Sequence, residues 1–224
     1  MSDALRELLA AAGIEARLGD ALACYGALVL ETNRSFNLTG AKTVDEIAAH
    51  LIDSLSVLPW IENDLVDVGS GAGFPAIPIA IASGIPIVAI ESTRKKATFL
   101  ERVLARFDLK GEVVSQRAET AAHRADLRER FSSATARAVS SAPTVAELVL
   151  PFVRIGGAAV LQRGSMDERE RAALADAGLM LGAEVEREHA LHGGRSIVVL
   201  RKIAPTPLRF PRRTGIPEKR PLCM

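Results

Sequence analysis

A glycine-rich turn between an apolar strand and an apolar helix constrains this chain more than any other feature. The segment is Val66-Asp67-Val68-Gly69-Ser70-Gly71-Ala72-Gly73-Phe74. Glycines at this spacing let the backbone turn tightly out of a strand and lie directly against a ligand. The next predicted strand ends at Glu91, where a carboxylate can accept hydrogen bonds from both hydroxyls of a ribose. The loop and the acid together predict a site for a nucleoside-type cofactor.

A dinucleotide site shares these parts but needs its third glycine elsewhere. The NAD-type fingerprint is G-x-G-x-x-G, and Phe74 occupies the position of its third glycine, while Gly73 comes one residue early. S-adenosylmethionine has no pyrophosphate, and its amino-acid end can lie along a turn built from Gly69, Gly71 and Gly73. The loop therefore favours S-adenosylmethionine, and an NAD site or a purely structural turn are the alternatives.

Strands and helices alternate from residue 64 onward. Apolar periodicity predicts strands at 64–68, 85–90, 112–115, 132–139, 157–162, 183–188 and 196–202, and helices at 74–82, 95–107, 119–129, 144–153 and 166–177. Such alternation predicts an α/β fold with a mostly parallel seven-stranded sheet and helices on both faces. Only residues 189–195 join the last two strands, which is too short for a parallel crossover, so this pair should be antiparallel.

Different patterns precede and follow this region. Helical spacing at 4–12, 18–33 and 43–58, the last opened by a capping box of Thr43 and Glu46, predicts N-terminal helices over residues 1–60. The Rossmann-like domain is then expected over residues 61–203. Residues 204–224 contain five prolines among arginines and lysines, which predicts an extended, basic, proline-rich tail.

Composition excludes several classes of protein. The 224 residues carry 28 Lys and Arg against 27 Asp and Glu, so the chain is no polycation, although residues 92–137 and the tail are locally basic. Cys24 and Cys223 give neither a metal-ligand spacing nor a disulfide framework. The acidic start lacks a signal-peptide pattern, and the interrupted apolar stretch 76–90 is too short to span a membrane. We expect a cytoplasmic protein with no metal and no membrane partner.

Further polar residues are predicted near the same crevice, because ligands bind outside the carboxyl ends of strands in such sheets. Ala118-Glu119 follows the third strand and can recognise the edge of an adenine. A first-turn acid favoured by the helix dipole is the other explanation for Glu119. His50 and Asp53 share one helix face, but two groups make a poor metal site. We expect them to hydrogen-bond to the segment Asn33–Leu38.

Several motifs together resemble the RsmG (GidB) methyltransferases, which modify N7 of one guanine in bacterial 16S ribosomal RNA. The motifs are 33–39, 50–54, 66–75, the paired Arg117 and Arg137, and a tail at 210–222 like that of many members. The similarity runs from about residue 20 to 202. It implies the class I Rossmann-like methyltransferase fold, S-adenosylmethionine as the methyl donor, 16S ribosomal RNA or the small subunit as the partner, and guanine 527 as the target.

The resemblance also implies roles for individual residues. Cofactor contacts are expected at Gly69, Phe74, Ala118, Glu119 and Arg137, with Glu91 on the ribose, beside the Gly71 and Gly73 of the loop. RNA contacts are implied at Arg117, Arg137 and Arg195. We also expect RNA contacts at Lys95, Arg163, Arg212 and Arg213, with Arg163 replacing a lysine of many relatives. Arg117 and Arg137 are the candidate catalytic residues.

The implied chemistry needs no general base, because N7 of guanine already carries an unprotonated lone pair. The protein must align the reactants and exclude water. We expect Arg117 or Arg137 to hold O6 or a phosphate, since a guanidinium at N7 would block attack. The rival hypotheses are a methyltransferase for another RNA or a small molecule, an NAD-dependent oxidoreductase, and a ribosome-associated module that binds cofactor without turnover.

Overall fold

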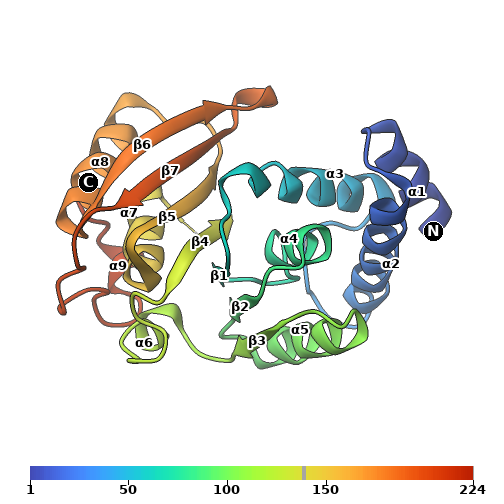
Figure 1. Cartoon of the computed structure of the whole chain (residues 1–224), viewed down its shortest axis with the longest axis horizontal. Coiled ribbons are helices and arrows are strands. Elements are labelled where there is room, and N and C mark those ends of the chain that lie inside the picture. The colour runs from blue at the N-terminus through green and yellow to red at the C-terminus, as the bar shows by residue number, and fades with distance from the viewer. Residues whose placement is uncertain (138–139, 224) are drawn as a thin grey trace.

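The computed structural model describes residues 1–137 and 140–223, and its centre is one mixed sheet (Figure 1). The strands are β1 (Leu65–Val68), β2 (Ile87–Ile90), β3 (Gly111–Val114), β4 (Phe131–Arg137), β5 (Val153–Arg163), β6 (Ala183–Ala190) and β7 (Ser196–Lys202). Their order across the sheet is β3-β2-β1-β4-β5-β7-β6. Neighbours from β3 to β5 are parallel, whereas β7 is antiparallel to both β5 and β6. The predicted seven-stranded, mostly parallel sheet with an antiparallel last pair is confirmed.

Helices cover both faces because successive strand residues point to opposite sides. The helices are α1 (Ser2–Ala11), α2 (Ala16–Asn33), α3 (Val44–Leu55), α4 (Ala76–Ser83), α5 (Arg94–Arg106), α6 (Ala118–Ala121), α7 (Ala142–Val149), α8 (Glu168–Met180) and α9 (Ile216–Lys219). Leu65 packs in one apolar core with residues of α1 to α5, and Val66 packs in a second core with residues of α6 to α8. In β5, Val160 likewise packs in the first core and Leu161 in the second.

The N-terminal helices continue the first of these cores. Leu5 and Leu9 of α1 are fully buried in it, and Gly26 of α2 allows a close approach, since a Cβ there would lie 2.8 Å from Ile47 of α3. The predicted capping box is confirmed, with reciprocal hydrogen bonds between Thr43 and Glu46 at the start of α3. Within the described residues no helix has the length and apolarity needed to cross a membrane.

The order of the strands reverses beside β1, which has β2 on one side and β4 on the other. A crevice for ligands forms outside the carboxyl ends of the strands at such a switch point. The chain places Gly69 after β1, Glu91 after β2, Arg117 after β3, Arg137 at the end of β4 and Arg163 at the end of β5. Five residues singled out in the sequence therefore meet along one edge of the sheet.

The segment after residue 203 is not the extended tail that its composition predicted. It folds back over α6, α7 and α8 and includes the short helix α9 (Figure 1). Phe210 and Leu222 are buried in the second core, and the Arg128 guanidinium donates to the carbonyl oxygens of Thr206 and Phe210. The segment docks because burial of its apolar side chains stabilises it against the core more than its proline and arginine content favours an extended, solvated chain.

Several other predicted elements differ from the structure in their bounds. The helix expected over 144–153 ends at Val149, and the strand expected over 157–162 begins at Val153. The helix expected over 119–129 ends at Ala121, and turns follow up to Glu129, whose φ is 52°. These turns position Arg128 to hold the C-terminal segment, which local periodicity does not encode. The strand expected over 132–139 begins at Phe131, and residues 138 and 139 lie outside the described part of the chain.

Candidate active site

All three glycines of the loop adopt a backbone conformation that favours glycine, and Gly71 and Gly73 differ in the space around them. Gly69, Gly71 and Gly73 all have positive φ, at 73°, 57° and 100°, a region that disfavours other residues. A Cβ on Gly73 would lie 2.5 Å from Ile77 and 2.9 Å from the Tyr25 hydroxyl, so this glycine is required by packing. A Cβ on Gly71 would meet only the Gly69 carbonyl oxygen at 3.8 Å. The space over Gly71 is therefore open to a ligand.

The N-terminal helix α2 packs against the glycine loop and holds it in place. Tyr25 of α2 is fully buried, and its hydroxyl donates to the Ala72 carbonyl oxygen at 2.5 Å. The Tyr25 ring packs edge-on against Phe74 at a centroid distance of 5.6 Å. Phe74 in turn lies 5.2 Å below the Arg137 guanidinium. One chain of contacts thus runs from α2 through the loop to the end of β4.

Glu91 connects the end of β2 to the glycine loop. Its carboxylate accepts from the Gly71 N–H at 2.9 Å and from the Thr93 N–H at 2.6 Å, and the residue is 7% exposed. Each carboxylate oxygen has a second lone pair, so these bonds leave acceptor capacity for a ligand. The predicted association of Glu91 with the loop is therefore present in the structure.

Asp67 is a buried acid that the sequence analysis did not assign to the site. It is 1% exposed, and neither carboxylate oxygen has a hydrogen-bond partner in the described part of the chain. Burial raises the pKa of Asp67 to about 7, against the opposing influence of Ser70 and Arg137. The sequence signal that could have identified Asp67 as a site residue is an acid in the middle of an otherwise apolar strand. An orphaned carboxylate beside a ligand loop suits a cationic group on that ligand.

A cavity of about 130 Å³ lies beside the loop. Its walls include Val68, Gly69, Ile90, Glu91, Gln116, Arg117, Ala118, Glu119, Ser140, Thr144, Leu148, Pro217 and Glu218. The structure thus brings together four of the predicted cofactor residues, and it adds two residues from the C-terminal segment. One oxygen of Glu119 already accepts from the Gly215 N–H at 2.9 Å. Gly71, Gly73, Phe74 and Arg137 do not line this cavity; Phe74 lies beneath the Arg137 guanidinium.

A second cavity, of about 400 Å³, adjoins the first at Ser140, which lines both. Its lining residues are Asp53, Arg137, Ser140, Gln162, Arg163, Gly164, Leu191, Arg195 and Ser196. Asp53 is largely buried; one oxygen accepts from Arg137 at 3.3 Å and the other from Arg195. The expected bond from Asp53 to the segment Asn33–Leu38 was therefore wrong. Asn33 holds that segment itself, through the Leu38 N–H and the Ala41 carbonyl oxygen.

Arg163 contributes a third guanidinium to this cavity. It donates to the Ser140 carbonyl oxygen at 2.7 Å and to Glu170 at 3.1 Å. Its buried Nε has no partner in the part of the chain that the structure describes. Burial and the nearby Arg137 lower the pKa of His50. The three guanidinium groups outnumber the carboxylates of Asp53 and Glu170 that pair with them, so the cavity has an excess of positive charge that suits an anionic substrate.

The other predicted RNA contacts divide into exposed and internal residues. Lys95, Arg117 and Arg213 are exposed. Arg212 is different, because its guanidinium forms an ion pair with the fully buried Glu147 at 2.7 Å. Its charge is therefore balanced by Glu147 within the protein. No cluster of His, Cys, Asp and Glu suited to a metal occurs among the described residues.

The sheet order, the glycine loop and the acid after β2 define the class I, Rossmann-like methyltransferases. Residues 19–198 match the family model for GidB, rRNA small subunit methyltransferase G, and the chain belongs to this family. The ribosomal RNA small subunit methyltransferase G of Pelotomaculum thermopropionicum is 38% identical over 88% of both chains. That of Chloroflexus aggregans is 41% identical over 85% of this chain and 84% of the relative.

A solved structure shares the fold at lower identity. It is an O-methyltransferase from Bacillus cereus in complex with S-adenosylhomocysteine, with a TM-score of 0.57 and 19% identity. The match covers 80% of this chain and 91% of that chain. At this identity the likeness bears on the fold alone.

Proposed function

We propose that this protein transfers the methyl group of S-adenosylmethionine to N7 of guanine 527 in 16S ribosomal RNA. The observation that carries the proposal is the meeting of two unlike cavities at Ser140. One is lined by Gly69 of the glycine loop and by Glu91, and the other contains three guanidinium groups. A nucleoside cofactor and a polyanionic substrate would thus lie side by side.

The residues of the first cavity and of the glycine loop beside it suit S-adenosylmethionine, whose methyl sulfonium supplies the reactive carbon. Glu91 would accept from the ribose hydroxyls with its remaining lone pairs. The open space above Gly71 would admit the amino-acid portion, and the orphaned carboxylate of Asp67 would compensate its ammonium group. Ala118 and the free oxygen of Glu119 would face the adenine.

The residues of the second cavity suit a splayed-out guanine and its phosphates. Arg137 is held by Asp53 and supported by the Phe74 ring, so its guanidinium has a fixed direction. A fixed donor can orient O6 or a phosphate while N7 attacks the methyl carbon in line. No residue has to remove a proton, because N7 attacks with its own lone pair. Alignment and the exclusion of water are then the contributions of the protein.

A thermal-unfolding experiment with two ligands tests the cofactor assignment. A ligand that binds the native state raises the unfolding temperature. We expect a rise with S-adenosylhomocysteine and none with NAD at the same concentration. A rise with NAD alone would replace the proposed methyl transfer with dinucleotide chemistry. Stabilisation by S-adenosylhomocysteine without methyl transfer to any RNA would instead favour a non-catalytic binding module.

A further inference from the structure

The C-terminal segment forms part of the wall of the cofactor cavity. Pro217 and Glu218, both in α9, line it together with Gly69, Glu91 and Ala118, which come from the sheet edge. About 100 residues of chain separate Ala118 from Pro217, and neither the glycine loop nor the strand pattern predicts this contact. The basic composition of the segment had suggested contacts with RNA only.

An internal ion pair fixes the segment to α7. Glu147 is fully buried, and it accepts from the backbone N–H of Arg212 at 2.8 Å and from the Arg212 guanidinium at 2.7 and 2.9 Å. A buried charge is tolerated only when it is paired in this way. The hydroxyl of Thr144, also fully buried, donates to the Pro217 carbonyl oxygen at 3.0 Å. These contacts hold α9 at one fixed position along α7.

A second set of contacts joins the segment to α6, on the other side of the cavity. The Gly215 N–H donates at 2.9 Å to Glu119, which is one of the two residues expected at the adenine. Gly215 has a φ of 79°, so the turn that points its N–H at Glu119 favours glycine. The His123 ring also contacts the Pro211 carbonyl oxygen at 2.9 Å. The segment therefore bridges α6 and α7 across the cavity.

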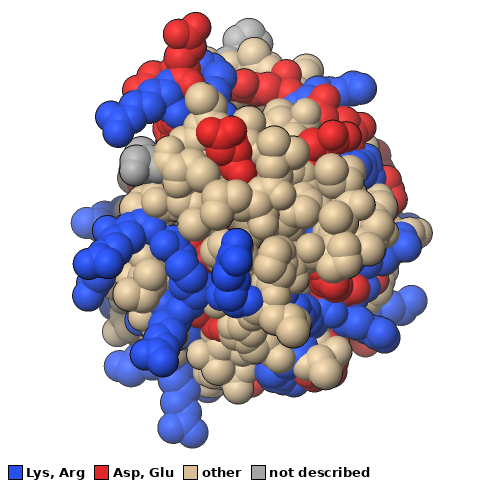
Figure 2. Space-filling model, turned by 90° about the vertical axis from the view of Figure 1, so that its left-hand side faces the viewer, with Lys and Arg blue, Asp and Glu red and all other residues tan. Residues whose placement is uncertain are grey.

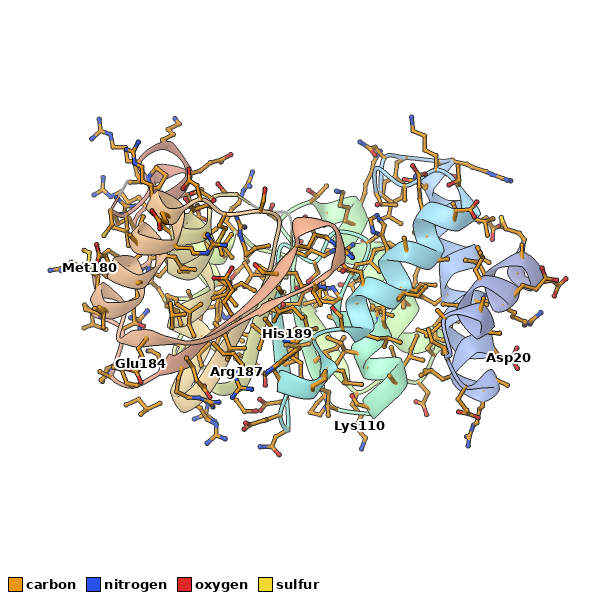
Figure 3. The ribbon with its side chains drawn as sticks, turned by 90° about the horizontal axis from the view of Figure 1, so that it is seen from above. Asp20, Lys110, Met180, Glu184, Arg187 and His189 are labelled. Carbon is orange, nitrogen blue, oxygen red and sulfur yellow. The ribbon has the colours of Figure 1, made fainter. Side chains whose placement is uncertain are left out.

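The chain is anchored on both sides of this bridge. Upstream, Phe210 is buried; downstream, Leu222 is buried and the Cys223 thiol lies 3.5 Å from the Met180 sulfur of α8. Figure 3 shows Met180 at the far end of the molecule, away from α3 and the N-terminal helices. Figure 2 views the end of the molecule that lies at the left of Figure 1, and basic side chains gather at its lower left. Arg209, Arg213 and Arg220 of the segment are exposed. The segment is thus a docked strap with a charged outer surface.

We propose that Pro217 and Glu218 are cofactor-binding residues that close the nucleoside end of the pocket. This inference rests on the proposed function, because it takes the cavity to hold the adenosine of S-adenosylmethionine. Pro217 offers an apolar ring to the base, and Glu218 offers a carboxylate that accepts from the exocyclic amine. Docking of the strap and affinity for the cofactor are then coupled.

Calorimetric titration of the full chain with S-adenosylhomocysteine tests this assignment. Glu218 is exposed, so its replacement leaves the core unchanged. Loss of a hydrogen bond to a charged group should weaken binding by about tenfold in Glu218→Ala. The matched control is Lys219→Ala, the next residue of α9, which is exposed and does not line the cavity. It should bind within about twofold of wild type.

A ligand without the amino-acid portion sharpens the test. Glu218→Ala should weaken 5′-methylthioadenosine by the same factor as S-adenosylhomocysteine, because the contact is made to the nucleoside. Equal affinities of Glu218→Ala and wild type, or a loss confined to S-adenosylhomocysteine, would overturn the inference. Failure of wild type to bind either ligand would instead overturn the proposed function, so the two failures are distinguishable.

Discussion

Replacing Asp67 by asparagine should change the stability of this protein in a pH-dependent way. Burial raises the pKa of Asp67 from 3.8 to about 7 in the folded chain. Above about pH 4 the Asp67 carboxyl is ionised in the unfolded state but still protonated in the folded state. The free energy of unfolding therefore falls as pH rises from about 4 to about 7. The loss is about 1.36 kcal/mol per pH unit between the two pKa values and levels off above pH 7, which gives about 2.6 kcal/mol between pH 5 and pH 8.

Urea denaturation of wild type and Asp67→Asn at pH 5 and pH 8 measures this quantity. The asparagine variant has no such proton, so its stability relative to wild type should be about 2.6 kcal/mol greater at pH 8 than at pH 5. Asp45→Asn, at an exposed position, is the control and should show no such difference. An Asp67→Asn effect of equal size at both pH values would refute the burial argument.

The remaining predictions concern the two cavities. Gly71→Val should abolish binding of S-adenosylhomocysteine in calorimetry while the chain still folds cooperatively, because the open space above the loop would be filled; unchanged affinity would remove the loop from the site. Glu91→Ala should weaken that ligand by about ten- to a hundredfold, and an affinity within about twofold of wild type would place the ribose elsewhere. Arg137→Ala should lower turnover as well as RNA affinity, whereas Arg213→Ala should leave turnover unchanged and reduce the log–log salt slope of RNA binding by roughly 0.7–0.9. Equal slopes for wild type and Arg213→Ala would show that Arg213 makes no phosphate contact.

The parts of the fold that the sequence predicts are those set by local pattern. Alternating apolar runs predict the strands, and the short connection before β7 predicts its antiparallel pairing with β6. The sequence assigns the glycine loop and Glu91 to one nucleoside site, because each follows a predicted strand, and the structure pairs these two strands in parallel. Their meeting, seen in the hydrogen bond from the Gly71 N–H to Glu91, follows directly from that topology.

The parts that the sequence does not predict depend on partners far apart in the chain. Asp53 lies 84 residues from Arg137 and 142 from Arg195, and no periodicity relates the three. The pair of Glu147 and Arg212 spans 65 residues and converts a basic tail into a docked strap. Local composition indicates how well a segment is solvated. Whether the segment remains in solvent or docks depends on the surface that it packs against, which residues far away in the chain form.

The most direct test of the account is methyl transfer from labelled S-adenosylmethionine into 16S ribosomal RNA, followed by mapping of the modified base. The account predicts one methyl group per RNA, at N7 of guanine 527, and strongly reduced labelling with Arg137→Ala. RNA in which that guanine is replaced by adenine should remain unlabelled. A methyl group at another atom or another nucleotide, or no transfer by a protein that binds S-adenosylhomocysteine, would contradict it.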